Sequence, residues 1–282
     1  MTASAGLPIG VFDSGMGGLT VLAELRRAMP CESFVYLGDS ARLPYGTKSA
    51  ATVERYARQA AAVLATRGVK ALVVACNTAS ATALPALARD FAPLPVFGVL
   101  EPGARAAANA ANASGVLVLA TESTIQGGAY QRALLAEKSN MPVHGRACPL
   151  WVTLAEQGHL SSRHWLDAQI LSDGLKGLAR LDSAPSEQRP TYPSTILLGC
   201  THFPVFRRML QDILGARVTL VDSAETTALA VAQALAEQNL LCSEDNDQGF
   251  CQFLATDGVA RFRKVGQFFL GEPIANVELV DL

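Results

Sequence analysis

The feature that most limits how this chain can fold is a regular alternation of short apolar runs with longer segments of helical periodicity. Runs of four or five residues, bounded by turn-forming residues, recur at Ile9–Phe12, Phe34–Gly38, Ala71–Ala75, Val96–Leu100, Val116–Ala120, Val143–Ala147, Thr195–Gly199 and Val218–Val221. Such runs are typical of buried strands, and strands that alternate with helices form a mostly parallel sheet. The sequence therefore predicts an α/β fold.

The segment after the second of these strands shows the helical pattern most clearly. Apolar or small residues recur at helical spacing from Val53 to Leu64. Thr47 is the predicted N-cap of this helix, because a hydroxyl side chain can accept a bond from the first free amides. Gly68 is predicted to end it, because glycine favours the position after the last turn.

The second four strands repeat the first four in the residues that follow them. Cys76-Asn77-Thr78 follows the third strand of the first set, and Cys200-Thr201-His202 follows the third strand of the second set. We interpret this correspondence as two related α/β lobes.

The order of the strands also predicts where the lobes begin and end. The first lobe is expected to comprise residues 1–100 and 223–282, and the second residues 101–222, with the break at Glu101-Pro102-Gly103. The last segment is expected to complete the first lobe with strands near Phe250–Ala255 and Val277–Val280. The stretch from Asp182 to Ser194 is rich in proline, serine and charge and is predicted to be a surface loop of the second lobe.

Composition narrows the class of protein. A chain of 282 residues has room for about two domains, and 50% AVILMFWYC residues with only 17% charged residues are typical of a packed globular protein. The 23 Lys and Arg residues nearly balance the 25 Asp and Glu residues, and no basic run stands out. Nucleic acid is therefore not expected as a primary partner.

Neither a signal peptide nor a membrane span is expected. The first basic residue is Arg26, so the N-terminus lacks the positive region of a signal peptide. No stretch reaches the roughly 18 consecutive apolar residues that a membrane helix needs. We therefore expect a cytoplasmic protein that does not enter a membrane.

Two of the six cysteines stand apart from the others. None forms a C-x-x-C pair, which argues against a zinc site, a thioredoxin motif and a disulfide scaffold. Cys76 and Cys200, however, follow strands at equivalent points of the two lobes, and ligands of parallel sheets bind at the carboxyl ends of strands. One such cysteine is commonly a small buried hydrophobe, but two at matching positions, each followed by polar side chains, predict chemistry.

Two facing thiols suit the removal of a proton from one face of a carbon and its delivery to the other. A disulfide exchanger would place its cysteines close in sequence, and a hydrolase would use one nucleophile with an oriented base. Proton exchange needs one thiolate and one thiol, so the ionised sulfur sets the direction of the reaction.

Other polar residues at strand ends are candidates for the same site. Asp13 ends an apolar strand, where a carboxylate is costly without a partner or a task; a solvated strand end is the alternative. Ser14 and the glycine-rich turn from Gly15 to Thr20 are predicted to meet a small anion such as a carboxylate. His202 can tune or exchange the proton of Cys200.

No cofactor or metal is expected. The turn lacks the last glycine of a dinucleotide fingerprint, because Thr20 stands in its place, and the chain contains no P-loop. None of the five lysines follows a strand in the way that positions a Schiff base.

Four motifs together resemble the glutamate racemases, cofactor-independent enzymes that supply D-glutamate for bacterial peptidoglycan and so for the cell wall and cell shape. The motifs are Gly10-Val11-Phe12-Asp13-Ser14-Gly15-Met16-Gly17-Gly18, Leu43-Pro44-Tyr45-Gly46, Val74-Ala75-Cys76-Asn77-Thr78-Ala79 and Leu198-Gly199-Cys200-Thr201-His202-Phe203-Pro204. The resemblance implies two pseudo-symmetric Rossmann-like lobes with mostly parallel sheets and the active site in the cleft between them.

The resemblance also implies roles for individual residues. Cys76 would take the proton from D-glutamate and Cys200 from L-glutamate, with Asp13 and His202 assisting. Glu156 would lie behind His202, although from the residues alone it reads as an ordinary helix-surface side chain. The groups implied to hold the substrate's carboxylates and amine are Ser14, Tyr45, Gly46, Asn77, Thr78, Thr121, Thr124 and Thr201.

Alternatives remain at this point. An aspartate or hydantoin racemase of the same superfamily is one, although His202 after the second Cys-Thr favours glutamate. A non-catalytic amino-acid-binding protein is another, but it has no use for two facing thiols. A homodimer is left open.

Overall fold

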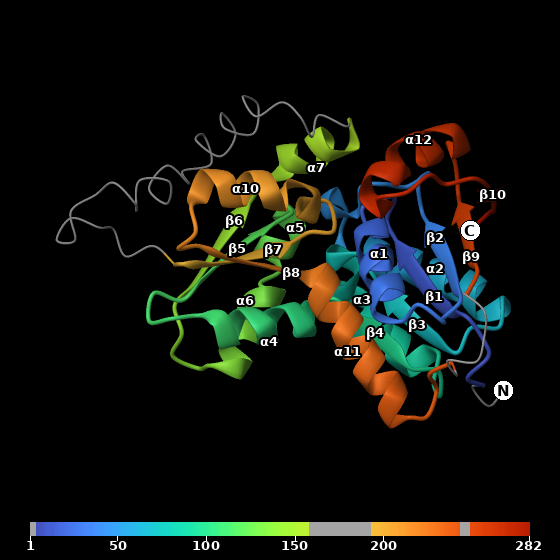
Figure 1. Ribbon diagram of the computed structural model, residues 1–282, viewed down its shortest axis with the longest axis horizontal. Helices are drawn as coiled ribbons and strands as arrows, with labels where there is room; N and C mark the ends of the chain where they lie inside the picture. Colours follow the sequence, from blue (N-terminus) through green and yellow to red (C-terminus); the bar gives the residue numbers. More distant parts are fainter. Residues whose placement is uncertain (1–3, 158–192, 243–248) are drawn as a thin grey trace.

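The computed structural model describes residues 4–157, 193–242 and 249–282, and their strands form two parallel sheets (Figure 1). The six-stranded sheet has the order β10-β9-β2-β1-β3-β4, and the four-stranded sheet has the order β6-β5-β7-β8. The first contains β1 (Ile9–Asp13), β2 (Phe34–Gly38), β3 (Ala71–Val74), β4 (Val96–Gly98), β9 (Cys251–Ala255) and β10 (Glu278–Leu279). The second contains β5 (Val116–Ala120), β6 (Val143–Ala147), β7 (Thr195–Gly199) and β8 (Thr219–Asp222). The predicted α/β fold with parallel sheets is confirmed.

Helices connect the strands and cover the sheets. The α-helices are α1 (Leu19–Ala28), α2 (Ala50–Thr66), α3 (Asn77–Asp90), α4 (Leu100–Ala110), α5 (Glu122–Gln126), α6 (Ala129–Glu137), α7 (Pro149–Glu156), α10 (Arg207–Leu214), α11 (Ser223–Glu237) and α12 (Val259–Leu270). Two short 3-10 helices are η1 (Tyr45–Thr47) and η3 (Phe203–Phe206). The central strands β1, β2 and β3 are buried along their whole length, as expected when helices pack on both faces of a parallel sheet.

The C-terminal segment returns to the six-stranded sheet, where β9 pairs with β2 and β10 pairs with β9. The residues Glu101-Pro102-Gly103 lie in the first turn of α4, where a proline is tolerated because its missing amide would have no helical partner. The chain therefore passes from one sheet to the other through a helix that begins at Leu100. The division into lobes at residues 100/101 and 222/223 stays a prediction.

Helix α2 begins two residues later than Thr47 would place it. Thr47 lies in η1, and the N-cap is Ser49, whose extended backbone lets its hydroxyl accept a bond from the Thr52 amide at 3.4 Å. Gly68 follows the helix with a φ of +71°, a conformation that favours glycine.

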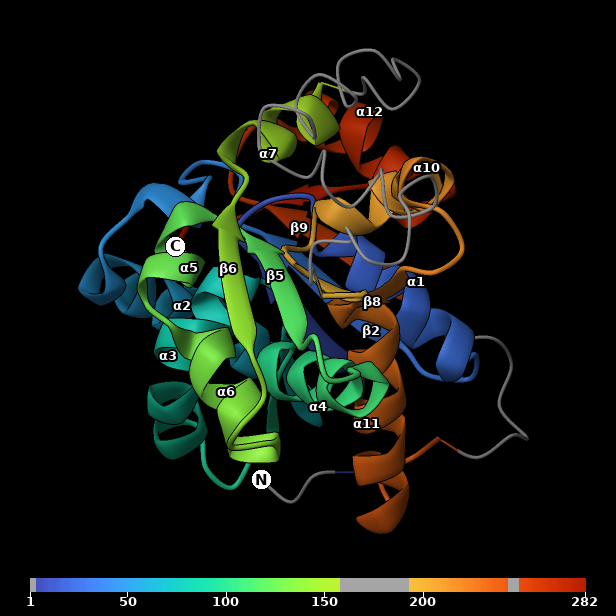
Figure 2. The same cartoon turned by 90° about the vertical axis from the view of Figure 1, so that its left-hand side faces the viewer.

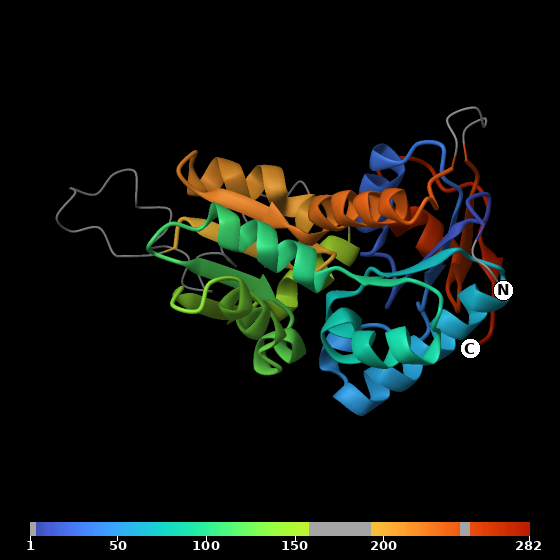
Figure 3. The same cartoon turned by 90° about the horizontal axis from the view of Figure 1, so that it is seen from below.

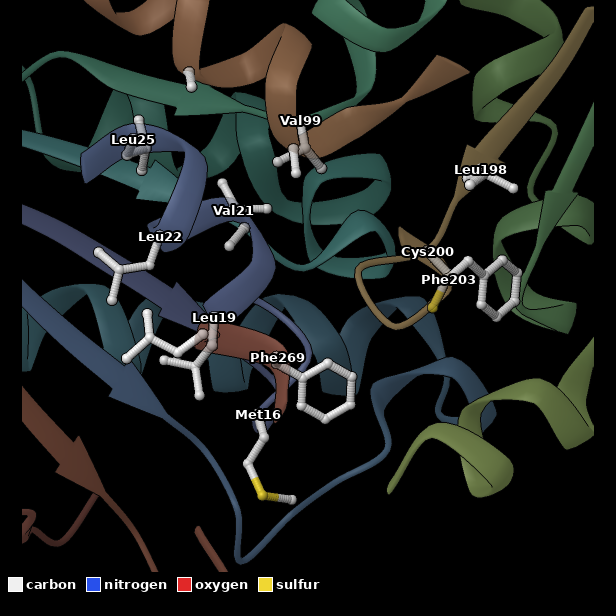
Figure 4. Close-up of a cluster of buried hydrophobic side chains, with 14 of the residues drawn as sticks. Met16, Leu19, Val21, Leu22, Leu25, Val99, Leu198, Cys200, Phe203 and Phe269 are labelled. Carbon is white, nitrogen blue, oxygen red and sulfur yellow. The ribbon is translucent and has the colours of Figure 1, made fainter. Parts of the chain in front are cut away.

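Helix α11 and a shared core join the two sheets. Figures 2 and 3 show α11, which follows β8, beside α4 on the four-stranded side; α11 also packs against α1 on the six-stranded side. One buried apolar cluster extends from Leu22 of α1 through Val99 to Leu198 and Phe203 on the four-stranded side (Figure 4). Cys200 belongs to this cluster, so its sulfur lies at the meeting point of the two halves.

The described part of the chain contains no helix long and apolar enough to cross a membrane. The stretch predicted as a surface loop, Asp182 to Ser194, lies outside the described residues except for its last two positions.

Candidate active site

The two predicted cysteines lie at the carboxyl ends of equivalent strands in the two sheets. Cys76 comes after β3 and is the N-cap of α3, while Cys200 directly follows β7. Each is only 5% exposed. Both are therefore buried groups with little access to bulk water.

The thiol of Cys76 is held by a serine of the neighbouring strand end. Its Sγ donates to Ser14 Oγ at 3.6 Å. Burial raises the pKa of Cys76 to about 12, and the negative charge of Asp13 adds to this, with a smaller contribution from Cys200. Cys76 is therefore a protonated thiol at neutral pH and can act as a proton donor.

Asp13 is completely buried, so the solvated strand end considered above is wrong. One carboxylate oxygen, Oδ2, accepts from the amide of Gly15 at 3.0 Å, and Oδ1 accepts from the Thr201 hydroxyl at 3.5 Å. Burial raises the pKa of Asp13 above its ordinary value, although the charge of His202 and nearby amides oppose this effect. The carboxyl group thus lies between the two halves with a raised proton affinity.

Cys200 belongs to a short relay of side chains. Its Sγ lies 3.8 Å from Nδ1 of His202, and Nε2 of His202 lies 3.1 Å from Oε1 of Glu156. Burial alone would lower the pKa of His202, but the hydrogen bonds to Cys200 and Glu156 raise it to about 10. His202 is therefore a cation at neutral pH.

Raising the pH from 6.5 to 10 is expected to lower the thermal unfolding midpoint of this protein more than that of a His202→Asn variant. The pKa of His202 rises on folding from 6.5 to about 10, so the folded chain holds one more proton across this window. The stabilisation that the protonated His202 gives to the folded state is complete below pH 6.5 and is lost as the pH rises through about 10. The free energy of unfolding falls by at most about 1.4 kcal/mol per pH unit in this window. Calorimetry on both proteins tests this, and parallel pH curves would contradict it.

The glycine-rich turn after β1 packs directly against the second half of the site. A Cβ at Gly17 would lie 2.4 Å from His202 Nδ1 and 2.6 Å from Thr201 Oγ1. The hydroxyl of Thr20 donates to the carbonyl oxygens of Gly17 and Thr201, at 2.9 Å each. The turn therefore positions Thr201 and His202 through close backbone contact.

Three threonine hydroxyls meet between α3 and α5. Oγ1 of Thr78 lies 3.2 Å from that of Thr121 and 3.3 Å from that of Thr124, and the latter two are 3.0 Å apart. The backbone of Gly46 packs directly against Thr121 of this group, because a Cβ at Gly46 would lie 2.9 Å from Cβ of Thr121. Rotating hydroxyls can donate or accept, so this cluster can rearrange around a carboxylate.

Asn77 is fixed by partners from two other elements. Its Oδ1 accepts from the Tyr130 hydroxyl at 2.5 Å, and its Nδ2 donates to Ser223 Oγ at 3.3 Å. These bonds orient the amide of Asn77 at the first turn of α3. Neither Tyr130 nor Ser223 was singled out in the sequence. Ser223 directly follows β8, so its position was a signal, whereas Tyr130 carries no local signal of its role.

Tyr45 is buried, and its hydroxyl is engaged away from the other candidates. It donates to Oδ2 of Asp39 at 2.5 Å, and Arg42 Nε donates to the same oxygen at 2.6 Å. Thr256 donates to the other oxygen, Oδ1, at 2.9 Å. Asp39 directly follows β2, as Asp13 ends β1, so its position was a signal for a structural or functional task that the sequence reasoning missed.

The structure thus brings the predicted residues together in three connected groups. Asp13, Ser14, Cys76 and Thr201 form one; Cys200, His202 and Glu156 form the second; and Thr78, Thr121, Thr124 and Gly46 form the third. Asn77 and Tyr45 flank them through bonds to other partners. Across the part of the chain that the structure describes, no three His, Cys, Asp or Glu side chains are grouped to hold a metal ion.

The chain is similar to known proteins along most of its length. A family model described as Asp/Glu/Hydantoin racemase matches residues 17–231. The chain belongs to this racemase family. A curated glutamate racemase from Geobacter metallireducens is 44% identical over 276 residues, which cover 97% of this chain and 96% of that protein.

Solved structures of the racemase family extend the likeness to the fold. Glutamate racemase from Thermus thermophilus, in complex with β-chloro-D-alanine, is 41% identical with a TM-score of 0.81, over 99% of this chain and 98% of that one. Glutamate racemase from Francisella tularensis, in complex with D-glutamate, is 33% identical with a TM-score of 0.83, over 98% of each chain. This racemase therefore shares its fold with them.

Proposed function

We propose that this protein is a glutamate racemase that interconverts L- and D-glutamate by two-base proton transfer. The observation that carries the proposal is the pair of buried cysteines at equivalent strand ends, each with its own polar partner, Ser14 for Cys76 and His202 for Cys200. Near-full-length similarity to curated glutamate racemases supports glutamate as the substrate. A non-catalytic amino-acid-binding protein would have no use for this arrangement.

The two sulfurs would act on opposite faces of the substrate's α-carbon. With L-glutamate, the Cys200 thiolate removes the α-proton and the Cys76 thiol delivers a proton to the other face. With D-glutamate the roles are exchanged. The high pKa of Cys76 supports its role as the proton donor when L-glutamate is the substrate, and His202 is the polar partner of Cys200 on the other side.

Thiolate basicity alone is insufficient, because the α-proton of an amino acid is a very weak acid. The negative charge that develops on the substrate must be stabilised by hydrogen bonds to its α-carboxylate in a site closed to water. The groups proposed to bind the carboxylates and the amine are Ser14, Tyr45, Gly46, Asn77, Thr78, Thr121, Thr124 and Thr201. Burial of most of these side chains supports such a site.

Asp13 and His202 would assist the proton transfers from either side. The raised pKa of Asp13 suits a group that exchanges a proton near Cys76. His202 would stabilise the thiolate of Cys200, and Glu156 would keep the imidazole cationic and aligned. None of these steps requires a metal or an organic cofactor.

The proposed role is the supply of D-glutamate for peptidoglycan, and the proposed location is the cytoplasm. The mechanism needs both thiols in reduced form, and the cytoplasm keeps thiols reduced. Cys76 and Cys200 are both free in the structure.

The purified protein is expected to convert either enantiomer of glutamate to a racemic mixture, with a metal chelator present and without pyridoxal phosphate. Chiral chromatography of both time courses measures this, with L-aspartate as the comparison substrate, which should react far more slowly. Loss of activity when the chelator is added would contradict the cofactor-independent mechanism. Equal rates with aspartate would instead indicate a broader amino-acid racemase.

A further inference from the structure

The relay that runs from Cys200 through His202 to Glu156 extends to one further residue, Arg261. Nη2 of Arg261 donates to Oε2 of Glu156 at 3.0 Å, while Oε1 of the same carboxylate faces His202 at 3.1 Å. Each carboxylate oxygen therefore has its own cationic partner. Glu156 ends α7, which follows β6 of the four-stranded sheet, whereas Arg261 lies on α12, between β9 and β10 of the six-stranded sheet.

The carboxylate of Glu156 needs more than one cationic partner to stay ionised at the end of α7. It is the last residue of α7, where the free carbonyl groups of a helix end carry partial negative charge and disfavour a carboxylate. Its side chain is only 8% exposed, so water compensates little. Burial alone would raise the pKa of Glu156, and the bonds from His202 and Arg261 together bring it below the ordinary value.

Helix α12 contacts the relay at a second point. The ring of Phe269 lies edge-on to the imidazole of His202, with centroids 5.2 Å apart at an interplanar angle of 79°. Arg261 and Phe269 are about two turns apart on α12. One helix thus restrains both the ring of His202 and the carboxylate that orients it. Helices α7 and α12 both lie along the upper edge of the molecule in Figures 1 and 2.

We propose that Arg261 is a positioning residue that fixes Glu156, and through it His202, for proton transfer at Cys200. With Oε2 held by Arg261, the carboxylate cannot rotate, so Oε1 stays directed at Nε2 and the other ring nitrogen at the sulfur. The alignment of one cysteine therefore depends on a helix packed with the opposite sheet. This inference rests on the proposed racemase function.

The contribution of Arg261 should be moderate and confined to one face of the substrate. Its side chain is 56% exposed, so solvent screens its charge and its loss leaves His202 still bonded to Glu156. The bonds of Cys76 and Ser14 do not involve α12. Arg261→Gln should therefore weaken proton removal by Cys200 about three- to tenfold and leave removal by Cys76 unchanged.

Elimination from the D- and L-enantiomers of a single diastereomer of 3-chloroglutamate distinguishes proton removal on the two faces. A thiolate removes the α-proton, the electron pair of that C–H bond forms a C=C bond, and the C–Cl bond breaks to release chloride. Only one cysteine acts in each reaction, and Cys200→Ser and Cys76→Ser define which enantiomer each serves. Arg263→Gln is the matched control, because Arg263 lies on the same helix and donates to the Ile274 carbonyl at 3.1 Å, away from the relay.

The expected result is a three- to tenfold slower elimination in Arg261→Gln from the enantiomer that Cys200 serves, and a change below twofold for the other. Arg261→Lys should recover part of the loss, Arg263→Gln should match the parent, and all thermal midpoints should stay close together. Equal losses with both enantiomers, or no loss with either, would overturn the positioning role while glutamate racemisation by the parent protein leaves the proposed function intact. A parent protein that fails to racemise glutamate would overturn both.

Discussion

Replacing Cys76 or Cys200 by serine is expected to slow the interconversion of glutamate enantiomers by several orders of magnitude while leaving the protein folded. A positioned acid or base typically contributes about 10² to 10⁴ in rate, and in a racemase each cysteine acts as the base in one direction and as the acid in the other. Serine occupies nearly the same space but is a far weaker acid, so it fails in both roles. Circular dichroism of the glutamate signal gives the rate.

The control for this substitution is Cys31→Ser. Cys31 is a free, half-buried thiol that does not follow a strand. Its replacement should leave the racemisation rate within about twofold of the parent. A Cys76→Ser or Cys200→Ser protein that keeps a tenth or more of the parent rate would show that the sulfur is not an essential acid or base.

Gly17→Ala is expected to reduce racemisation by roughly 10²-fold with only a small loss of stability. The added methyl group would overlap the ring of His202 and the hydroxyl of Thr201, at 2.4 and 2.6 Å. Because His202 is packed against Phe269 and bonded to Glu156, the ring cannot yield without moving away from Cys200. Misplacement of catalytic groups by about 1 Å costs on the order of 10² in rate.

Gly6→Ala is the matched control, because a Cβ at Gly6 would have no atom within 4 Å. Initial rates with L-glutamate and thermal midpoints of both variants should be measured together. If Gly17→Ala is as active as Gly6→Ala, the turn does not position His202. If it is instead unfolded, the glycine serves stability rather than alignment.

Much of the fold and the two cysteines of the candidate site could be predicted from the sequence, for physical reasons. Strands buried on both faces are mostly apolar, so β1 and β3 could be recognised as short apolar runs. Parallel strands present their carboxyl ends to one edge, which made the residues after them, Cys76 and Cys200, the natural candidates. The duplication strengthened both predictions.

What the sequence could not reveal depends on packing between distant elements. Glu156 reads as a helix-surface residue by itself, yet the tertiary structure buries it against His202. Arg261 lies 105 residues further along the chain and shows no local pattern that links it to Glu156. Ser49 replaced Thr47 as the N-cap of α2 because the preceding residues form a 3-10 turn, which local propensity did not indicate.

The most direct test of the two-base mechanism is elimination from the D- and L-enantiomers of a single diastereomer of 3-chloroglutamate by the two serine variants. Only one thiolate is needed for each enantiomer, so each variant should lose one reaction and keep the other. Cys76→Ser is expected to retain elimination from the L-enantiomer and lose it from the D-enantiomer, and Cys200→Ser is expected to show the reverse. If both variants keep the same enantiomer preference, one sulfur is not an acid or base, and the two-base mechanism is wrong.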